Sequence, residues 1–215
     1  MLLGVMTQAL QPLDGARGRL IVFEGIDGTG KSTHIRLLKE FLEARGVVVW
    51  TGFEPTRGEW GMRVRRAAMS GVRLGVEEEV ECLLRDRREH VEGCILPALG
   101  RGEWVLLDRY YLSMMAYQGA SGVDMQRIRA LNEEFAPVPD LAFWLDIPVE
   151  LSMRRIAERG QGADAFEKRA FQEEVARLYA AMDMPFVQRI DAAGPPEQTQ
   201  AAIRAELVRR GLCCG

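Results

Sequence analysis

The chain has 215 residues, 47% of them hydrophobic, which is enough for one sizeable core and too few to require two. Its 28 basic and 31 acidic residues give a formal net charge of -3, which excludes the strong positive field of a protein held on nucleic acid or on an anionic membrane. The four cysteines lack C-x-x-C spacing and metal-ligand partners, and no apolar run is long enough to cross a bilayer, so we expect reduced thiols in a cytoplasmic protein.

The predicted elements begin after an N-terminal tail. Residues 1–18 lack the basic start and the long apolar core of a signal peptide, so we expect a flexible tail before a single domain over residues 19–212. Residues 19–24 hold four successive apolar residues, a pattern typical of a strand buried on both faces of a parallel sheet. Helical spacing follows from Lys31 and ends at Gly46, a good C-terminal cap.

Strands and helices alternate along the rest of the chain. Helical patterns follow Pro148 and cover residues 76–99 and 198–209, and apolar runs predict strands over 47–51, 104–107, 141–146 and 186–190. Alternation of this kind predicts an α/β fold, with a parallel sheet of about five strands and helices on both faces.

A phosphate-binding loop joins the first predicted strand to the first predicted helix. Residues 25–32 read GIDGTGKS and fit G-x-x-x-x-G-K-[ST] in the strand–loop–helix context that this motif requires, which indicates a P-loop NTPase fold. Glycines let backbone N–H groups converge on phosphate oxygens, Lys31 bridges the β- and γ-phosphates, and Ser32 offers its hydroxyl to Mg²⁺. The alternative is a glycine-rich turn that only caps a helix, with Lys31 solvated.

The loop therefore predicts binding of ATP and Mg²⁺. The residues expected to hold the nucleotide are Gly25, Asp27, Gly28, Thr29, Gly30, Lys31, Ser32 and Thr33.

An acidic and a basic residue follow the strand predicted at 104–107. Asp108 and Arg109 come at the carboxyl end of a parallel strand, where sheets of this kind place their ligands. There Asp108 can hold magnesium or accept a proton, and Arg109 can clamp a phosphoryl group in transfer. The alternative is that Asp108 only caps the next helix and that Arg109 is exposed.

Five short blocks of sequence together resemble the thymidylate kinase family. They read FEGIDG at 23–28, EPT at 54–56, DR at 86–87, DRY at 108–110 and AYQG at 116–119, in the family's order and at similar spacing. The resemblance covers residue 19 to the C-terminus and is more specific than the phosphate loop, which unrelated nucleotide enzymes share. It implies a homodimeric kinase that passes the γ-phosphoryl group of ATP to dTMP or a related pyrimidine deoxynucleotide, giving the diphosphate.

The resemblance also implies a role for each matching side chain. Asp27 would face the acceptor sugar, Arg87 and Arg109 would grip the acceptor phosphate and the group in flight, and Tyr117 would lie under the deoxyribose. Tyr117 as an ordinary core aromatic and Arg87 as an exposed helix charge paired with glutamates are the alternatives.

The residues so assigned fall into four groups. The catalytic ones are Lys31, Asp108, Arg109 and Arg159. Those for the metal are Ser32, Glu54 and Asp108, of which Glu54 would order magnesium-bound water. Arg155 joins the phosphate loop in binding ATP. The acceptor would be bound by Asp27, Glu54, Leu83, Arg87, Arg109, Ser113, Tyr117 and Gln118.

The chain departs from the family where the base would bind. Leu83 replaces a phenylalanine that stacks on thymine, and Met114 replaces a small polar residue that reaches the base edge. A different or modified pyrimidine is therefore an alternative substrate. Phe53 also replaces an arginine before the Glu-Pro pair, a position for which Arg57 could substitute.

The predicted lid over ATP, residues 159–168, lacks one cation. Arg155 and Arg159 match the family, but Ala165 stands where an arginine is expected, and Lys168 could replace it. Because such an arginine can carry several orders of magnitude in rate, a second hypothesis is a nucleotide-binding protein with weak or no transfer that acts as a sensor or assembly partner. A third keeps the kinase but gives it a sugar or other small hydroxyl acceptor, against which the block at 116–119 argues.

Overall fold

The computed structural model describes residues 18–71, 74–158 and 165–213, without the side chains of 165–168. The tail predicted before the domain therefore lies outside the described residues apart from Gly18. The same holds for Arg159 and for the side chains of Ala165 and Lys168 in the predicted lid.

The described residues form a parallel five-stranded sheet, which confirms the predicted α/β architecture. Its strands are β1 (Arg19–Glu24), β2 (Val49–Phe53), β3 (Trp104–Asp108), β4 (Leu141–Asp146) and β5 (Val187–Asp191). The order across the sheet is β2-β3-β1-β4-β5, so β1 is central and both its neighbours come from later in the chain. Phe23 pairs with Asp108 on one side and with Phe143 on the other, which brings the carboxyl ends of β1 and β3 together.

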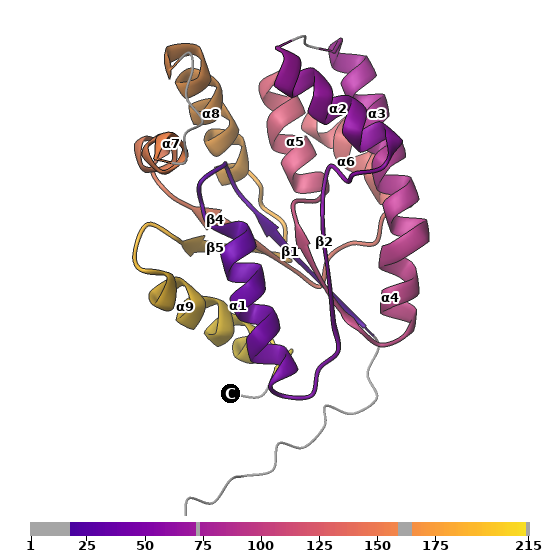
Figure 1. Cartoon of the computed structure of the whole chain (residues 1–215), viewed down its shortest axis with the longest axis vertical. Helices are drawn as coiled ribbons and strands as arrows, with labels where there is room; N and C mark the ends of the chain where they lie inside the picture. Colours follow the sequence, from indigo (N-terminus) through magenta and orange to yellow (C-terminus); the bar gives the residue numbers. More distant parts are fainter. Residues whose placement is uncertain (1–17, 72–73, 159–164, 214–215) are drawn as a thin grey trace, which may run out of the picture.

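Helices cover both faces of the sheet (Figure 1). The helices α1 (Lys31–Glu43) and α9 (Pro196–Arg209) pack together on one face. The opposite face carries α3 (Val76–His90), the π-helical turn η1 (Val91–Ile95), α4 (Leu96–Gly100) and α5 (Tyr111–Ala120). Four more helices complete the described chain, namely α2 (Glu59–Ser70), α6 (Met125–Glu133), α7 (Val149–Ala157) and α8 (Ala165–Ala180). None of the helices in the described residues is both long and apolar enough to cross a bilayer.

The central strands form where their apolar runs predict them, because both faces of the sheet are covered. Leu20 to Phe23 in β1 and Val105 to Leu107 in β3 are all buried, so every side chain of these runs removes apolar surface from water. The helix after β1 ends as its sequence predicts. Gly46 has φ 78°, and the N–H of Val47 donates to the carbonyl of Leu42 (3.2 Å) to close the last turn.

The second strand and the long helix differ in detail from their predictions. The second strand starts at Val49 and not at residue 47, because Val47 is used to close the preceding helix. The helix predicted over 76–99 is continuous in direction but passes through η1, where the bonding pattern changes at Val91. The helices α2, α5, α6 and α8 are not predicted from the sequence.

Candidate active site

The loop at residues 25–30 has the backbone that phosphate binding requires. Gly25, Gly28 and Gly30 have φ values of 128°, 78° and 90°, a region that glycine adopts at no steric cost. A Cβ on Gly25 would lie 2.5 Å from the carbonyl oxygen of Leu145, so only glycine fits there. The loop then enters α1 at Lys31, whose helix N-terminus directs unpaired N–H groups towards the same space.

Two side chains, one in the loop and one on α7, fix the shape of the loop. Thr29 is buried and its hydroxyl donates to the carbonyl of Ile26 (3.1 Å). Ser152, on α7, donates its hydroxyl to the carbonyl of Asp27 (2.6 Å). Thr33 lies on the first turn of α1 and, with Gly28 and Gly30, lines the pocket above the loop. The loop is thus pre-formed in the ligand-free chain.

Lys31 folds back over the loop and is only 7% exposed, so it is not the solvated lysine of the alternative hypothesis. Its Nζ donates to the carbonyls of Gly25 (3.2 Å) and Ile26 (3.1 Å). Burial lowers the pKa of Lys31 to about 8, and the positive charge of Arg109 acts in the same direction. A desolvated ammonium with only carbonyl partners is a strong site for an anion.

Ser32 and Asp108 meet at the mouth of the loop. The Ser32 hydroxyl donates to Oδ2 of Asp108 (2.6 Å), so two of the three residues predicted for magnesium are in contact. Among the described residues no group of three His, Cys, Asp or Glu side chains forms a metal site by itself. The donor set nevertheless fits Mg²⁺, which prefers oxygen ligands and commonly takes one or two from protein and the rest from phosphates and water.

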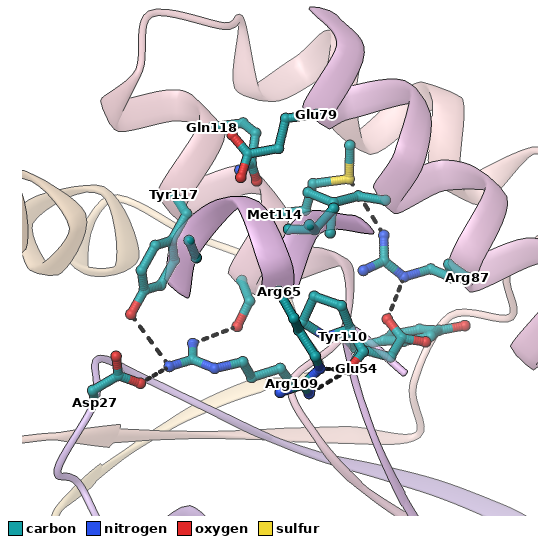
Figure 2. Close-up of a pocket in the computed structure, with 15 residues that line it drawn as sticks. Asp27, Glu54, Arg65, Glu79, Arg87, Arg109, Tyr110, Met114, Tyr117 and Gln118 are labelled. Atoms are coloured by element: carbon teal, nitrogen blue, oxygen red, sulfur yellow. Dashed lines mark hydrogen bonds and ion pairs between the residues drawn. The ribbon is translucent and has the colours of Figure 1, made fainter. Parts of the chain in front are cut away.

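Arg109 crosses the space between the loop and α5, and its side chain is 16% exposed. Its Nη1 donates to the carbonyl of Gly25 (3.1 Å) and to the hydroxyl of Ser113 (3.0 Å). Its Nη2 donates to the hydroxyl of Tyr117 (3.2 Å) and forms an ion pair with Asp27, as Figure 2 shows. Arg109 is therefore an anchored cation and not the exposed arginine of the alternative hypothesis.

A pocket of about 350 Å³ opens beside Arg109, between α2, α3 and α5 (Figure 2). Its volume lies in the range of small-molecule sites. All the residues predicted to bind an acceptor contribute to its lining, namely Asp27, Glu54, Leu83, Arg87, Arg109, Ser113, Tyr117 and Gln118. The structure thus brings together side chains from the loop, from the residues that directly follow β2 and β3, and from α3 and α5, which are far apart in the sequence.

A second pocket, of about 450 Å³, lies over the phosphate loop and contains Lys31, Ser32 and Asp108. The residues that line both pockets are Asp27, Glu54, Arg65 and Arg109. The two spaces therefore meet at a boundary that carries two guanidinium groups.

Arg87 is buried at the side of the first pocket, in a polar cluster. Its Nε donates to Oε2 of Glu54 (2.7 Å), and its Nη1 donates to Oδ1 of Asn132 (2.5 Å) and to the sulfur of Met114 (3.4 Å). The other carboxylate oxygen of Glu54 lies 2.9 Å from Nδ1 of His90. Arg87 is thus not an exposed helix charge, and both oxygens of Glu54 already have partners within the protein.

The wall expected to meet the base is apolar. Leu83 and Met114 are buried and line the first pocket, together with Val64 and Ala68 from α2. Tyr117 is half-buried at the other side, with its ring edge-on to Phe171 at 6.1 Å between centroids.

The guanidinium groups of two arginines lie against the ring of Phe53. The guanidinium carbons of Arg57 and Arg65 lie 5.8 and 5.2 Å from the ring centroid, and both side chains line the pocket over the phosphate loop. The sequence does not identify Arg65 as a site residue, because Arg65 lies on α2, a helix that the sequence does not predict. Arg155, predicted to bind ATP, lies against the loop and donates to backbone carbonyls of Gly28 (3.2 Å) and Ala193 (3.3 Å).

Comparison with known proteins agrees with this geometry. Residues 23–203 match the family model described as thymidylate kinase. The chain is 57% identical over 194 residues to a thymidylate kinase of Akkermansia muciniphila, covering 90% of this chain and 93% of that protein. It is 45% identical over 197 residues to one of Xanthomonas campestris pv. campestris (strain B100), covering 90% and 86%, and 44% identical over 187 residues to one of Desulfotalea psychrophila, covering 86% and 92%. The chain belongs to the thymidylate kinase family.

Proposed function

We propose that this chain transfers the γ-phosphoryl group of ATP to the phosphate of dTMP, giving dTDP and ADP. The observation that carries the proposal is the meeting of two pockets at Arg109 and Asp27. One pocket is floored by a phosphate loop with a buried lysine, as a triphosphate donor requires, and the other has the size and the mixed lining of a nucleotide site.

The proposed mechanism works by positioning and charge stabilisation, without a covalent intermediate. Lys31 and the loop amides bind the β- and γ-phosphate oxygens. Arg109, which lines both pockets, lies where a phosphoryl group would pass from donor to acceptor and balances its charge. Ser32 and Asp108 would hold Mg²⁺, which neutralises charge that develops on the transferred group.

We assign two of the three arginines of the acceptor pocket, Arg87 and Arg109, to different ends of the nucleotide. Arg109 contacts the phosphate loop, so it serves the acceptor phosphate. Arg87 bonds to Asn132 and Met114, which supports a place beside the base in preference to the phosphate proposed from the sequence. Tyr117 presents its ring to the sugar between them, and Asp27, held by Arg109, faces the same sugar.

A panel of acceptors tests the proposal. ADP release is measured with each common deoxynucleoside and ribonucleoside monophosphate, with ATP as donor. We expect dTMP to give the highest kcat/KM, and the ribonucleotides to fall below their deoxy counterparts because Tyr117 crowds the 2′ position. The proposal fails if no acceptor raises ADP release above the background without acceptor. The Lys31→Ala variant, which removes the ammonium from the loop, is the control for contaminating kinases.

The family resemblance also supports a homodimer, which we propose as the assembled form.

A further inference from the structure

Glu24 is a buried carboxyl group that the mechanism above does not use. It ends β1, directly before the phosphate loop, and is 1% exposed. Its Oε1 accepts the backbone N–H of Tyr110 (2.8 Å), and its Oε2 accepts the hydroxyls of Tyr179 (3.0 Å) and Ser113 (2.5 Å). Burying a carboxylate is unfavourable unless such donors compensate for the lost hydration, so a buried carboxylate at this position calls for a functional explanation.

The donors of Glu24 lead to Arg109 by two routes. The first is the side chain of Ser113, which gives its proton to Glu24 and accepts a hydrogen bond from Nη1 of Arg109 (3.0 Å). Because the hydroxyl proton points at Glu24, the oxygen lone pairs face the guanidinium. Without the carboxylate, this hydroxyl is free to turn its proton away and to weaken the contact.

The second route is the backbone. Arg109 has φ 70°, in the left-handed region, where a side chain with a Cβ is strained. Its own N–H donates to the carbonyl of Phe23 (2.9 Å), and the N–H of the next residue, Tyr110, donates to Glu24. The strained residue is thus held on both sides by the last two residues of β1.

We propose that Glu24 is a positioning residue for phosphoryl transfer, which fixes the backbone and the guanidinium of Arg109 at the boundary of the two pockets. The inference rests on the proposed function, because it assigns Arg109 to the phosphoryl group. Glu24 itself touches neither pocket; it acts through Ser113 and Tyr110.

The electrostatics of Glu24 agree with this role. Burial raises its pKa to about 7, against the hydrogen bond from Ser113, the charge of Arg109, the hydrogen bond from Tyr179 and the charge of Lys31, which all lower it. These groups come from every element packed on the carboxyl: the β3–α5 connection, α5, α8 and α1. The ionised fraction of Glu24 therefore decreases as the pH falls through 7, and the contacts through which Glu24 positions Arg109 weaken as it does so.

The Glu24→Gln variant tests the proposal, because it keeps the size of the side chain and removes the charge. Its NH₂ group also competes with Arg109 for the Ser113 oxygen. We expect kcat to fall by about tenfold or more, while KM for ATP changes by less than about threefold and the melting temperature shows a folded protein. The matched control is Glu206→Gln, the same change at a buried glutamate of α9 that pairs with Arg209 and Arg210 and lines neither pocket; its kcat should stay within about threefold of the unchanged chain.

A double-mutant cycle separates positioning from general stability. In an Arg109→Ala background, Glu24→Gln should cost nothing further, because both changes remove the same contribution. Equal costs in the two backgrounds, or an unchanged kcat in Glu24→Gln alone, would overturn the inference. Should Glu24→Gln not fold, Ser113→Ala cuts the side-chain route with the carboxylate in place, and an unchanged kcat there overturns the proposed hold of Glu24 on the guanidinium. An unchanged chain that phosphorylates no acceptor would contradict the proposed function itself. An active unchanged chain whose Glu24→Gln variant has the same kcat would contradict only this inference.

Discussion

At the scale of single residues, the site holds two cations against one carbonyl oxygen. Lys31 Nζ and Arg109 Nη1 both donate to the carbonyl of Gly25, at 3.2 and 3.1 Å. Their like charges repel, which contributes to the lowered pKa of Lys31. Bound phosphate would offer these two cations several charged oxygens in place of the one neutral carbonyl that they share. The ligand-free site is therefore suited to bind a polyanion.

The lowered pKa of Lys31 predicts that ATP binding takes up a proton in alkaline solution. The free chain loses the Lys31 proton above about pH 8, and bound phosphates raise that pKa again, so binding at about pH 8.5 should take up most of one proton, whereas binding near pH 7 should take up little. Calorimetry in buffers of different ionisation enthalpy measures this uptake. The Lys31→Arg variant, which keeps its charge at both pH values, is the control. Binding heats that are independent of the buffer at the higher pH would contradict the assignment.

The ring of Tyr117, and not its hydroxyl, is predicted to select deoxyribose. The hydroxyl accepts from Arg109 at 3.2 Å, and without it Arg109 keeps its ion pair with Asp27 and its bonds to Gly25 and Ser113. Tyr117→Phe should therefore change kcat/KM for dTMP by less than about threefold. Tyr117→Ala should raise the relative rate with ribothymidine monophosphate by about tenfold, as the space at the 2′ position opens. An inactive phenylalanine variant would show that the hydroxyl has a role of its own.

At the scale of elements, the sequence predicts what periodicity and motifs encode. The strands β1, β3 and β4 were found because they are buried on both faces, and the phosphate loop because its glycines are required by backbone geometry. The sequence does not predict α5, although this helix carries Ser113 and Tyr117, because most of its residues are buried and no polar face marks it as helical. The eight acceptor residues were assigned by resemblance, and neither their common pocket nor the links of Glu24 to Arg109 are visible in residue spacing.

Helix α2 supplies a cation, Arg65, that the sequence does not identify as a site residue. Arg65 lines both pockets and lies against Phe53, the residue that replaces the family's arginine before the Glu-Pro pair. Arg65→Ala should therefore lower kcat by about tenfold or more, with the fold intact. Arg63 is the matched control on the same helix: it is exposed and pairs with Glu78 outside the pockets, so Arg63→Ala should stay within about threefold. Equal effects of the two variants would rule out a specific role for Arg65.

At the scale of the whole molecule, the topology explains why the two pockets meet. All five strands are parallel, so their carboxyl ends share one edge of the sheet. The phosphate loop follows β1 and Arg109 follows β3, the strand paired beside it. Helices α2, α3 and α5 then enclose the space above that edge, which places an acceptor opposite the loop.

The central claim is direct transfer between these two pockets, and product identification with labelled ATP tests it most directly. The chain is incubated with dTMP and with ATP radiolabelled in its γ-phosphate, and the products are separated by chromatography. We expect the label to appear in the terminal phosphate of dTDP at the rate at which ADP forms. Label that accumulates only as inorganic phosphate, or that stays in ATP, would contradict that claim.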